Sequence, residues 1–311
     1  MKIGLFTDGL ADLSLEAACD AAAALGIEMV EIGTGNFSPS PHCNLDQLLE
    51  DAAARDAFKR TLAERGLGLS ALNCSGNLLH PNETVGHGAR EVFRKTVLLA
   101  ELLGLDRIVT MSGCPGGPDG GSYPNWVTLR WPPELSALLD WQWEAVILPF
   151  WREQVRFAER HGVRRICLEI HPGMAVYNTA TLLRLRAEVG PIVGANFDPS
   201  HFFWQGMDPR IVAEELAGAV YHSHAKDTKL DPRSTAINGV LAAEWPEARG
   251  PVSWWFTTMG DGHDAAFWRQ FYANLQRGGY DDVLSIEYED PHRPARESIA
   301  RAVELLREVM P

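Results

Sequence analysis

The 311-residue sequence lacks the features of membrane and exported proteins. It has no apolar run that approaches the roughly 18 residues of a membrane-spanning helix. Its first residues, Met-Lys-Ile-Gly-Leu-Phe, resemble a strand and carry no long apolar signal region. We therefore expect a protein without a membrane partner that is neither anchored nor exported.

Cysteines are few, and their spacing shows no metal-binding or redox motif. There are five cysteines, an odd number, and no two form a Cys-x-x-Cys pair. Cys167 lies inside an apolar run. This usage favours reduced, mostly buried thiols, so we expect a cytoplasmic protein.

Positive charge is also in deficit. The 28 basic residues are outnumbered by 41 acidic residues, which gives a net charge of −13, and the basic residues are scattered along the chain. A protein that binds a phosphate backbone normally presents a positive face, so we expect no nucleic-acid partner. The Gly-rich stretch 113–121 has no Gly-Lys-Ser/Thr and does not match a P-loop, so a phosphorylated substrate is not inferred.

Four apolar segments, each too short for a helix, carry an ionisable side chain near their ends. The segments are 165–172 with Glu169, 192–199 with Asp198, 219–227 with His224, and 283–291 with Glu287. Helical patterns lie between the strands, as in consecutive β-α-β units. Eight such units close into a barrel whose strand ends surround one mouth. We therefore predict a divalent metal held by these four residues, because oxygen and imidazole ligands suit a hard or borderline cation.

The pattern predicts one (β/α)8 TIM barrel domain over residues 1–311. Strands are expected near 2–6, 28–32, 67–73, 107–111, 165, 192, 219 and 282–287. Helices are expected near 14–25, 45–65, 89–103, 143–161, 179–189, 208–217, 265–277 and 296–310. The second strand carries Glu31 near its end. Two long connections, about 112–139 and 226–262, are expected to be active-site loops, since long loops in compact domains are usually functional.

The two-residue repeat of a strand places further polar residues on the same strand faces as the predicted metal ligands. Residues two apart in a strand share a face, so Glu169 pairs with His171, His222 with His224, and Glu287 with Glu289. One member of a pair can ligate while the other orients it or meets the substrate. For His171 and His222 a core position is left open, and for Glu289 a capping or rim position.

Four motifs together resemble the sugar phosphate isomerase/epimerase family with a xylose-isomerase-like barrel. They are Leu-Glu-Ile-His-Pro at 168–172, Asn-Phe-Asp-Pro-Ser-His at 196–201, His-Ser-His-Ala-Lys-Asp at 222–227, and Ser-Ile-Glu-Tyr-Glu-Asp-Pro at 285–291. The resemblance covers essentially the whole chain. It implies that Glu169, Asp198, His224 and Glu287 bind a divalent ion, manganese being expected and magnesium, cobalt or zinc being alternatives.

The same resemblance implies substrate contacts. His201 matches the substrate-contacting histidine of the family. Lys226 belongs to a His-x-Lys-Asp pattern, and we expect it to contact substrate in place of an arginine. Ketose 3-epimerases of the family have that arginine six residues after the ligand histidine, where this chain has Leu230. We expect His171, His80 and Trp126 to contact substrate as well, and Trp204, Trp254 and Trp255 to wall a covered pocket or to pack in the fold or at a subunit interface.

The expected chemistry is proton abstraction next to a carbonyl. Glu169 and Glu287 are the predicted acid/base pair, and the ene-diolate between them can yield an epimer, an isomer or an elimination product. We predict a sugar isomerase or epimerase with a small carbohydrate as its partner, and a homo-oligomer is left open. The alternatives are a dehydratase or eliminase acting on a keto-inositol or 3-keto-glycoside, the related endonuclease branch, which the acidity disfavours, and a non-catalytic metal-binding subunit.

Overall fold

The computed structural model describes residues 1–241 and 252–311. Eight of its strands form a closed barrel in the order β1-β10-β7-β6-β5-β4-β3-β2. The pairings of β1 with β2 and β10, of β10 with β7, and of the strands from β3 to β6 are parallel. The predicted (β/α)8 barrel is therefore confirmed.

The barrel strands are short and buried. They are β1 (Lys2–Phe6), β2 (Met29–Gly33), β3 (Gly68–Asn73), β4 (Arg107–Met111), β5 (Arg165–Glu169), β6 (Val193–Phe197), β7 (Val220–Ala225) and β10 (Val283–Ile286). Every residue of β4 and β6 is buried. Strands of a parallel barrel are covered on both faces, which is why they appear in the sequence as nearly continuous apolar runs.

Helices follow the strands and begin at capping residues. They are α1 (Leu15–Ala24), α2 (Leu45–Glu50), α3 (Ala52–Ala63), α4 (Glu83–Leu103), α5 (Pro133–Trp141), α6 (Leu148–Arg160), α7 (Thr179–Val189), α8 (Ser200–Phe203), α9 (Pro209–Glu215), α10 (Pro232–Asn238), α11 (Ala265–Arg277) and α12 (Ala295–Val309), with a 3-10 turn η1 (Thr7–Leu10) and a π-helical turn η2 (Gln142–Ile147). The side chains of Ser14, Asn178 and Asp264 accept backbone N–H groups at the starts of α1, α7 and α11. These bonds satisfy donors that a helix N-terminus leaves free.

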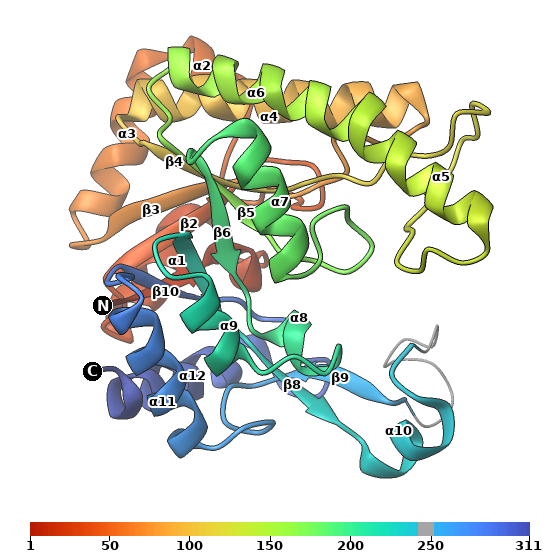
Figure 1. The fold of residues 1–311 in the computed structure, drawn as a ribbon. Helices are drawn as coiled ribbons and strands as arrows, with labels where there is room; N and C mark the ends of the chain where they lie inside the picture. The colour runs from red at the N-terminus through yellow and green to blue at the C-terminus, as the bar shows by residue number, and fades with distance from the viewer. Residues whose placement is uncertain (242–251) are drawn as a thin grey trace. The chain divides into compact units, whose positions relative to one another are not determined.

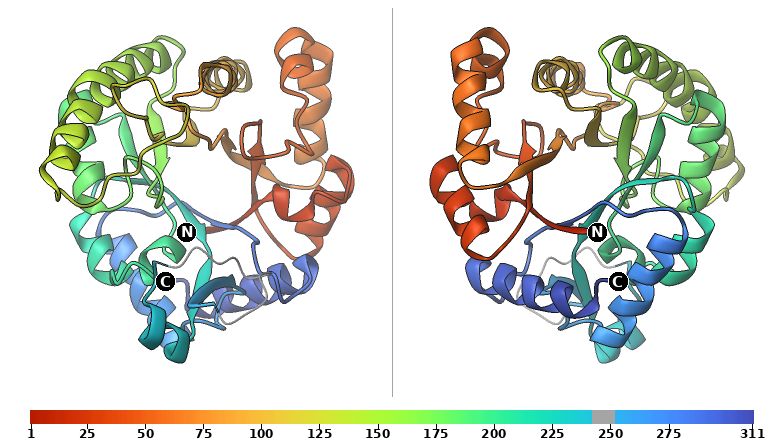
Figure 2. Two further views of the ribbon diagram at one scale, coloured as in Figure 1. Left: turned by 90° about the vertical axis from the view of Figure 1, so that its right-hand side faces the viewer. Right: turned by 90° about the vertical axis from the view of Figure 1, so that its left-hand side faces the viewer.

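Contacts divide the chain into two units. The first unit comprises Met1–Glu31, Arg60–Ser70 and Phe197–Pro311, and the second comprises Ile32–Lys59 and Ala71–Asn196. In the first unit α9 and α12 pack against α11 (Figure 1). In the second unit α2 packs beside α4 and α6 beside α7, and Figure 2 gives two further views of these helices.

Two predicted helices differ from those observed. The single helix expected over 45–65 is wrong, because Asp51 adopts an extended backbone between α2 and α3 and its carboxylate accepts the N–H of Ala53 at 2.8 Å. Aspartate competes for backbone donors in this way and so favours helix ends. Helix α4 begins at Glu83 and not at Ala89, behind the cap Asn82. Its start was missed because glycine lowers helix propensity, yet Gly86 is required, since a Cβ there would lie 2.5 Å from the carbonyl oxygen of His80.

The two long connections contain secondary structure. In 226–262, β8 (Asp227–Leu230) and β9 (Trp254–Thr257) form an antiparallel pair, and α10 lies between them in the sequence. Residues 242–251 of this connection lie outside the described residues. In 112–139, α5 begins at Pro133 and continues into η2. Sequence patterning missed β9 because Trp254, Trp255 and Phe256 show no alternation of apolar and polar residues.

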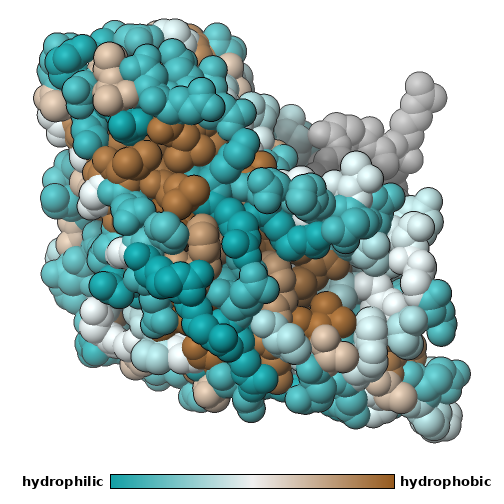
Figure 3. Space-filling model, turned by 90° about the horizontal axis from the view of Figure 1, so that it is seen from above, coloured by the Kyte–Doolittle hydropathy of each residue, from teal (hydrophilic) through white to brown (hydrophobic). Residues whose placement is uncertain are grey.

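The surface is mainly hydrophilic on the face seen from above, where hydrophobic residues form separate patches (Figure 3). Within residues 1–241 and 252–311, no helix is both long enough and apolar enough to span a bilayer.

Candidate metal and substrate site

Three of the predicted ligands converge in the first unit. Asp198 follows β6, His224 lies in β7, and Glu287 follows β10. One ligand atom from each lies within 4.8 Å of the others. Asp198 and His224 are fully buried, while the side chain of Glu287 is 14% exposed. Two carboxylates and one imidazole are a donor set that fits a divalent cation such as Mn²⁺, Mg²⁺ or Zn²⁺.

Lys226 places a buried ammonium group beside these carboxylates. Its Nζ lies 2.7 Å from Glu287 Oε2, 2.6 Å from Glu289 Oε2 and 3.2 Å from Asp198 Oδ2. The same atom lies 4.3 Å from the centre of the Phe256 ring. The contacts of Lys226 with both Glu287 and Glu289 agree with the prediction that residues two apart share a face.

His201 belongs to the same group. It lies on α8, directly after the Asp-Pro-Ser turn, and its Nε2 is 3.2 Å from Asp198 Oδ2. Its ring meets the edge of Phe256 at 5.4 Å between centroids. The histidine is buried. The structure therefore brings His201 and Lys226 next to Asp198, and their contact with substrate stays a prediction.

Charges within this group shift its ionisation. Burial alone would raise the pKa of Asp198, but Lys226 and His201 offset this and hold that pKa well below its usual value. Burial alone would lower the pKa of His224, but Glu31 and Glu287 raise it well above its usual value. The neighbouring charges thus favour the ionised form of Asp198 and the protonated form of His224.

Glu31 is a further buried carboxylate beside these residues, and the sequence predicts it only as part of a strand. It is fully buried in β2, and its Oε2 lies 2.8 Å from His222 Nε2 and 3.1 Å from His224 Nε2. Ser285 Oγ donates to the same oxygen at 2.7 Å. The only signal in the sequence is an ionisable residue inside the apolar strand Met-Val-Glu-Ile-Gly. His222, which the sequence predicts either as a core histidine or as a site residue, is buried and also contacts this carboxylate.

Aromatic side chains of the β8–β9 pair lie near Lys226 and His201. Trp204 and Trp254 stack with centroids 4.4 Å apart and an interplanar angle of 6°, and Trp254 contacts Phe256. Trp255 points to the other side of β9 and meets His292. Trp254 and Phe256 therefore share a face, as alternation along a strand requires.

Glu169 and His171 belong to the second unit. Glu169 is the last residue of β5, is buried, and stands in register with Asn196 of β6. His171 follows two residues later and is half-buried, and its Nδ1 lies 2.5 Å from the carbonyl oxygen of Pro172. The buried position of Glu169 at a strand end is the position predicted for a ligand.

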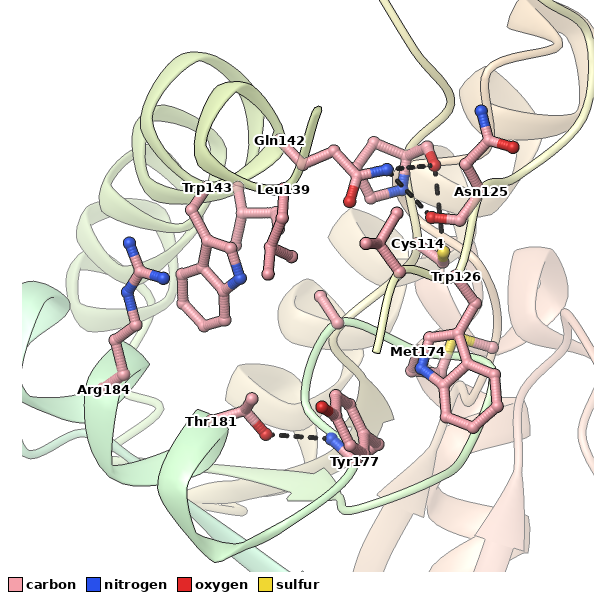
Figure 4. A pocket seen from close by; sticks show the side chains of 14 residues that line it. Cys114, Asn125, Trp126, Leu139, Gln142, Trp143, Met174, Tyr177, Thr181 and Arg184 are labelled. Atoms are coloured by element: carbon pink, nitrogen blue, oxygen red, sulfur yellow. Dashed lines mark hydrogen bonds between the residues drawn. The ribbon is translucent and has the colours of Figure 1, made fainter. Parts of the chain in front are cut away.

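His80 and Trp126 line two different pockets of the second unit. His80 faces a pocket of about 600 Å³ together with Asn36, Phe37 and Met174. Trp126 lines a smaller pocket of about 80 Å³ and meets Tyr177 edge to face at 5.4 Å (Figure 4). Their role as substrate contacts stays a prediction.

The smaller pocket is held by one amide side chain. Gln142 donates from Nε2 to the carbonyl oxygens of Gly116 and Asn125, both at 2.9 Å, and Figure 4 shows the amide turned toward these loop segments. On the far side, the Arg184 guanidinium lies 4.1 Å from the centre of the Trp143 ring. These contacts order the Gly-rich connection after β4, which the sequence reasoning expected to be a functional loop.

Residues 19–309 match the family model described as "Xylose isomerase-like TIM barrel". The chain is 41% identical over 314 residues to the protein YfiH of Bacillus subtilis (strain 168), covering 100% of this chain and 99% of that protein. A 30% match to the rhizopine catabolism protein MocC of Rhizobium meliloti covers 49% of this chain and 45% of MocC.

Solved structures share the fold at low sequence identity. The probable 3-DHS dehydratase AsbF of Bacillus anthracis has a TM-score of 0.66 and 17% identity, covering 99% of each chain. The IOLI protein with a bound zinc atom has a TM-score of 0.64 and 20% identity, and a D-tagatose 3-epimerase-like protein 0.63 and 21%, each covering 99% of this chain and 98% of the other. At these identities the likeness shows the fold.

Proposed function

The chain belongs to the xylose isomerase-like TIM barrel family, and we propose that it is a divalent-metal-dependent enzyme that isomerises or epimerises a sugar or keto-sugar. The observation that carries the proposal is the buried group of Asp198, His224 and Glu287 with His201 and Lys226 beside it. Burying carboxylates and histidines costs free energy even when they are paired, so a cluster of them inside a barrel indicates a functional role. The barrel topology supports adding Glu169 as the fourth ligand, because strand carboxyl ends surround one mouth in this fold.

The proposed reaction moves a proton next to a carbonyl. When bound, the cation would polarise the carbonyl and stabilise negative charge on its oxygen. Glu287 is the less buried carboxylate of its group and is suited to meet substrate, so we assign it one proton transfer and assign Glu169 the other. Lys226 supplies a fixed positive charge, and His201 a hydrogen-bonding group, for the oxygens of the substrate. The aromatic face of Trp254 and Phe256 supports a ring-shaped carbohydrate.

A dehydratase or eliminase acting on a keto-inositol or 3-keto-glycoside is the second candidate. The arginine that the resemblance to ketose 3-epimerases predicts is absent, and Leu230 stands at that position in β8, paired with Trp254. A probable 3-DHS dehydratase shares this fold, so the barrel is compatible with either reaction. Both reactions begin with the same proton abstraction.

We further propose that the protein is cytoplasmic. All five cysteines are buried thiols, which is the state expected in a reducing compartment.

Deuterium exchange tests the proposed function. The Mn²⁺-loaded protein is incubated in deuterated water with ketoses, inososes and 3-keto-glycosides, and the products are followed by NMR. We expect deuterium next to the carbonyl with the wild type and with Glu304→Gln, an exposed control on α12, but not with Glu287→Gln. The identity of the product separates isomerisation from elimination.

Two results would refute the proposal. Exchange by Glu287→Gln at the wild-type rate would remove Glu287 from the proton transfer. A wild-type protein that binds no divalent ion by calorimetry and exchanges none of the panel would remove the metal-dependent reaction.

A further inference from the structure

Glu31 sits at the centre of a buried hydrogen-bond network in the first unit. Its carboxylate accepts hydrogen bonds from Nε2 of His222, from Nε2 of His224 and from the hydroxyl of Ser285, with donor–acceptor distances of 2.7 to 3.2 Å. All four residues are fully buried. Because an ionised carboxylate can only accept hydrogen bonds, each of these three partners must present a hydrogen to it.

The two nitrogens of His224 therefore face different groups. Nε2 points to Glu31, whereas Nδ1 lies 3.1 Å from Glu287 Oε2, on the side of the proposed ligands. Phe6 stacks on the imidazole at 6.1 Å with an interplanar angle of 14°, which limits rotation of the ring. One ring thus connects the buried carboxylate to the group that offers ligands.

We infer that Glu31 is a positioning residue: it keeps a hydrogen on Nε2 of His224 and so makes Nδ1 the nitrogen that ligates a cation. This inference rests on the proposed metal site. A histidine ligand generally donates its other N–H to a carboxylate or carbonyl, which fixes its tautomer and orientation. In this chain the arrangement is doubled, since His222 donates to the same carboxylate. Ser285 supplies the third hydrogen bond, so Glu31 itself is held in place.

The substitution Glu31→Gln tests this role. A carboxamide retains one acceptor oxygen but presents N–H groups on its other side, and these repel an Nε2–H. The hydrogen of His224 is then free to occupy Nδ1, where it blocks a ligand position. We expect the affinity for Zn²⁺ and Mn²⁺ to fall about 10- to 100-fold. Glu31→Asp keeps an acceptor carboxylate, one methylene shorter, and should recover part of the affinity.

The measurements combine NMR with calorimetry. Protein carrying ¹⁵N-labelled histidine is recorded free of metal and with Zn²⁺, and His224→Gln assigns the resonances. In the wild type we expect the Nε2–H signal of His224 to persist when Zn²⁺ is added, with Nδ1 bound to the metal. The matched control is Glu28→Gln, an exposed glutamate next to the same strand, which should behave as the wild type. Circular dichroism establishes that each variant is folded.

Three outcomes separate this inference from the proposed function. An altered Nε2–H signal and weaker metal binding in Glu31→Gln, with partial recovery in Glu31→Asp, support the inference. An unchanged signal or unchanged affinity in a folded Glu31→Gln overturns it while leaving the metal site in place. A wild type that binds neither metal overturns the metal site, and with it the ligand role of Nδ1.

Discussion

The substitution Asp227→Asn should lower the stability of the protein by several kcal/mol. Asp227 is fully buried at the start of β8 and accepts five hydrogen bonds. Oδ2 accepts the backbone N–H groups of Gly260, Gly262 and His263 at 3.1, 3.0 and 2.9 Å. Oδ1 accepts the Thr228 N–H and His263 Nδ1, both at 2.8 Å. One carboxylate thus ties the β8–β9 pair to the segment before α11.

The magnitude follows from the donors that asparagine cannot satisfy. In its better orientation the amide oxygen replaces Oδ2 and keeps three hydrogen bonds, while the amide nitrogen faces the Thr228 N–H and His263 Nδ1. The amide nitrogen can donate to His263 Nδ1 in the other tautomer of the ring, but the Thr228 N–H loses its acceptor, at about 1.5–3 kcal/mol. The three remaining hydrogen bonds no longer involve a charge, which costs about 0.5–1 kcal/mol each, so the total is about 3–6 kcal/mol. Since unfolding entropy is about 2.1 cal/mol/K per residue, a loss of this size in a chain of 311 residues corresponds to a melting temperature lower by about 5–9 °C.

Thermal unfolding by differential scanning calorimetry measures this effect. Asp12→Asn is the matched control, because Asp12 is exposed and its carboxylate lies 3.7 Å from Arg296. A surface ion pair contributes about 0–1 kcal/mol, so the control should shift the melting temperature by less than about 2 °C. An Asp227→Asn variant that melts within the same window would refute the reasoning.

Three further predictions concern ionisation. Burial raises the pKa of Cys43 to about 12, and all five thiols are buried. At pH 8 the thiols of the native protein should therefore react with a disulfide reagent far more slowly than those of the unfolded protein, in which all five should react. Burial alone would lower the pKa of His224, but Glu31 and Glu287 raise that pKa well above its usual value. At the proposed site a cation would have to displace a proton from the His224 ring, so the Mn²⁺ affinity measured by calorimetry should rise about tenfold per pH unit below this pKa. Burial alone would raise the pKa of Asp198, but the neighbouring ammonium and imidazole hold that pKa well below its usual value. The ionised Asp198 therefore stabilises the folded protein above its unfolded pKa of about 3.9, and this contribution is lost as the pH falls through the folded pKa. Asp198→Asn should accordingly lessen the acid-induced fall in melting temperature.

Local periodicity predicted much of the barrel and of the first-unit site. Short apolar runs ending in Asp198 and Glu287 are strands whose carboxyl ends carry those residues. Spacing of two also predicted shared faces, and both Glu287 and Glu289 contact Lys226. The strand predictions succeeded because buried parallel strands appear as short apolar runs. Glu287 and Glu289 lie beyond the end of β10, so their common contact with Lys226 depends on the loop that follows it.

Individual side-chain and backbone contacts decide what sequence periodicity leaves open. The break at Asp51 depends on one side-chain bond to Ala53, and the early start of α4 depends on a glycine that tolerates the nearby backbone of His80. His80 and Trp126 are both predicted to contact substrate, and the structure places them in different pockets. Loop conformation determines such placements, and it has no period in the sequence.

Glu31 differs from Asp198 and Glu287 in its position relative to the end of its strand. Asp198 and Glu287 follow the ends of their strands, but Glu31 lies inside β2, level with Phe6 of β1. Its partners also lie inside strands, and Ser285 of β10 stands in register with His224 of β7. They are 191 to 254 residues away in the sequence. A carboxylate within a barrel strand can orient the groups above it, whereas one beyond the strand end can reach a substrate. The pattern of apolar runs with an ionisable end predicts Asp198 and Glu287 as ligands, whereas an ionisable residue inside an apolar strand is all that marks Glu31 in the sequence.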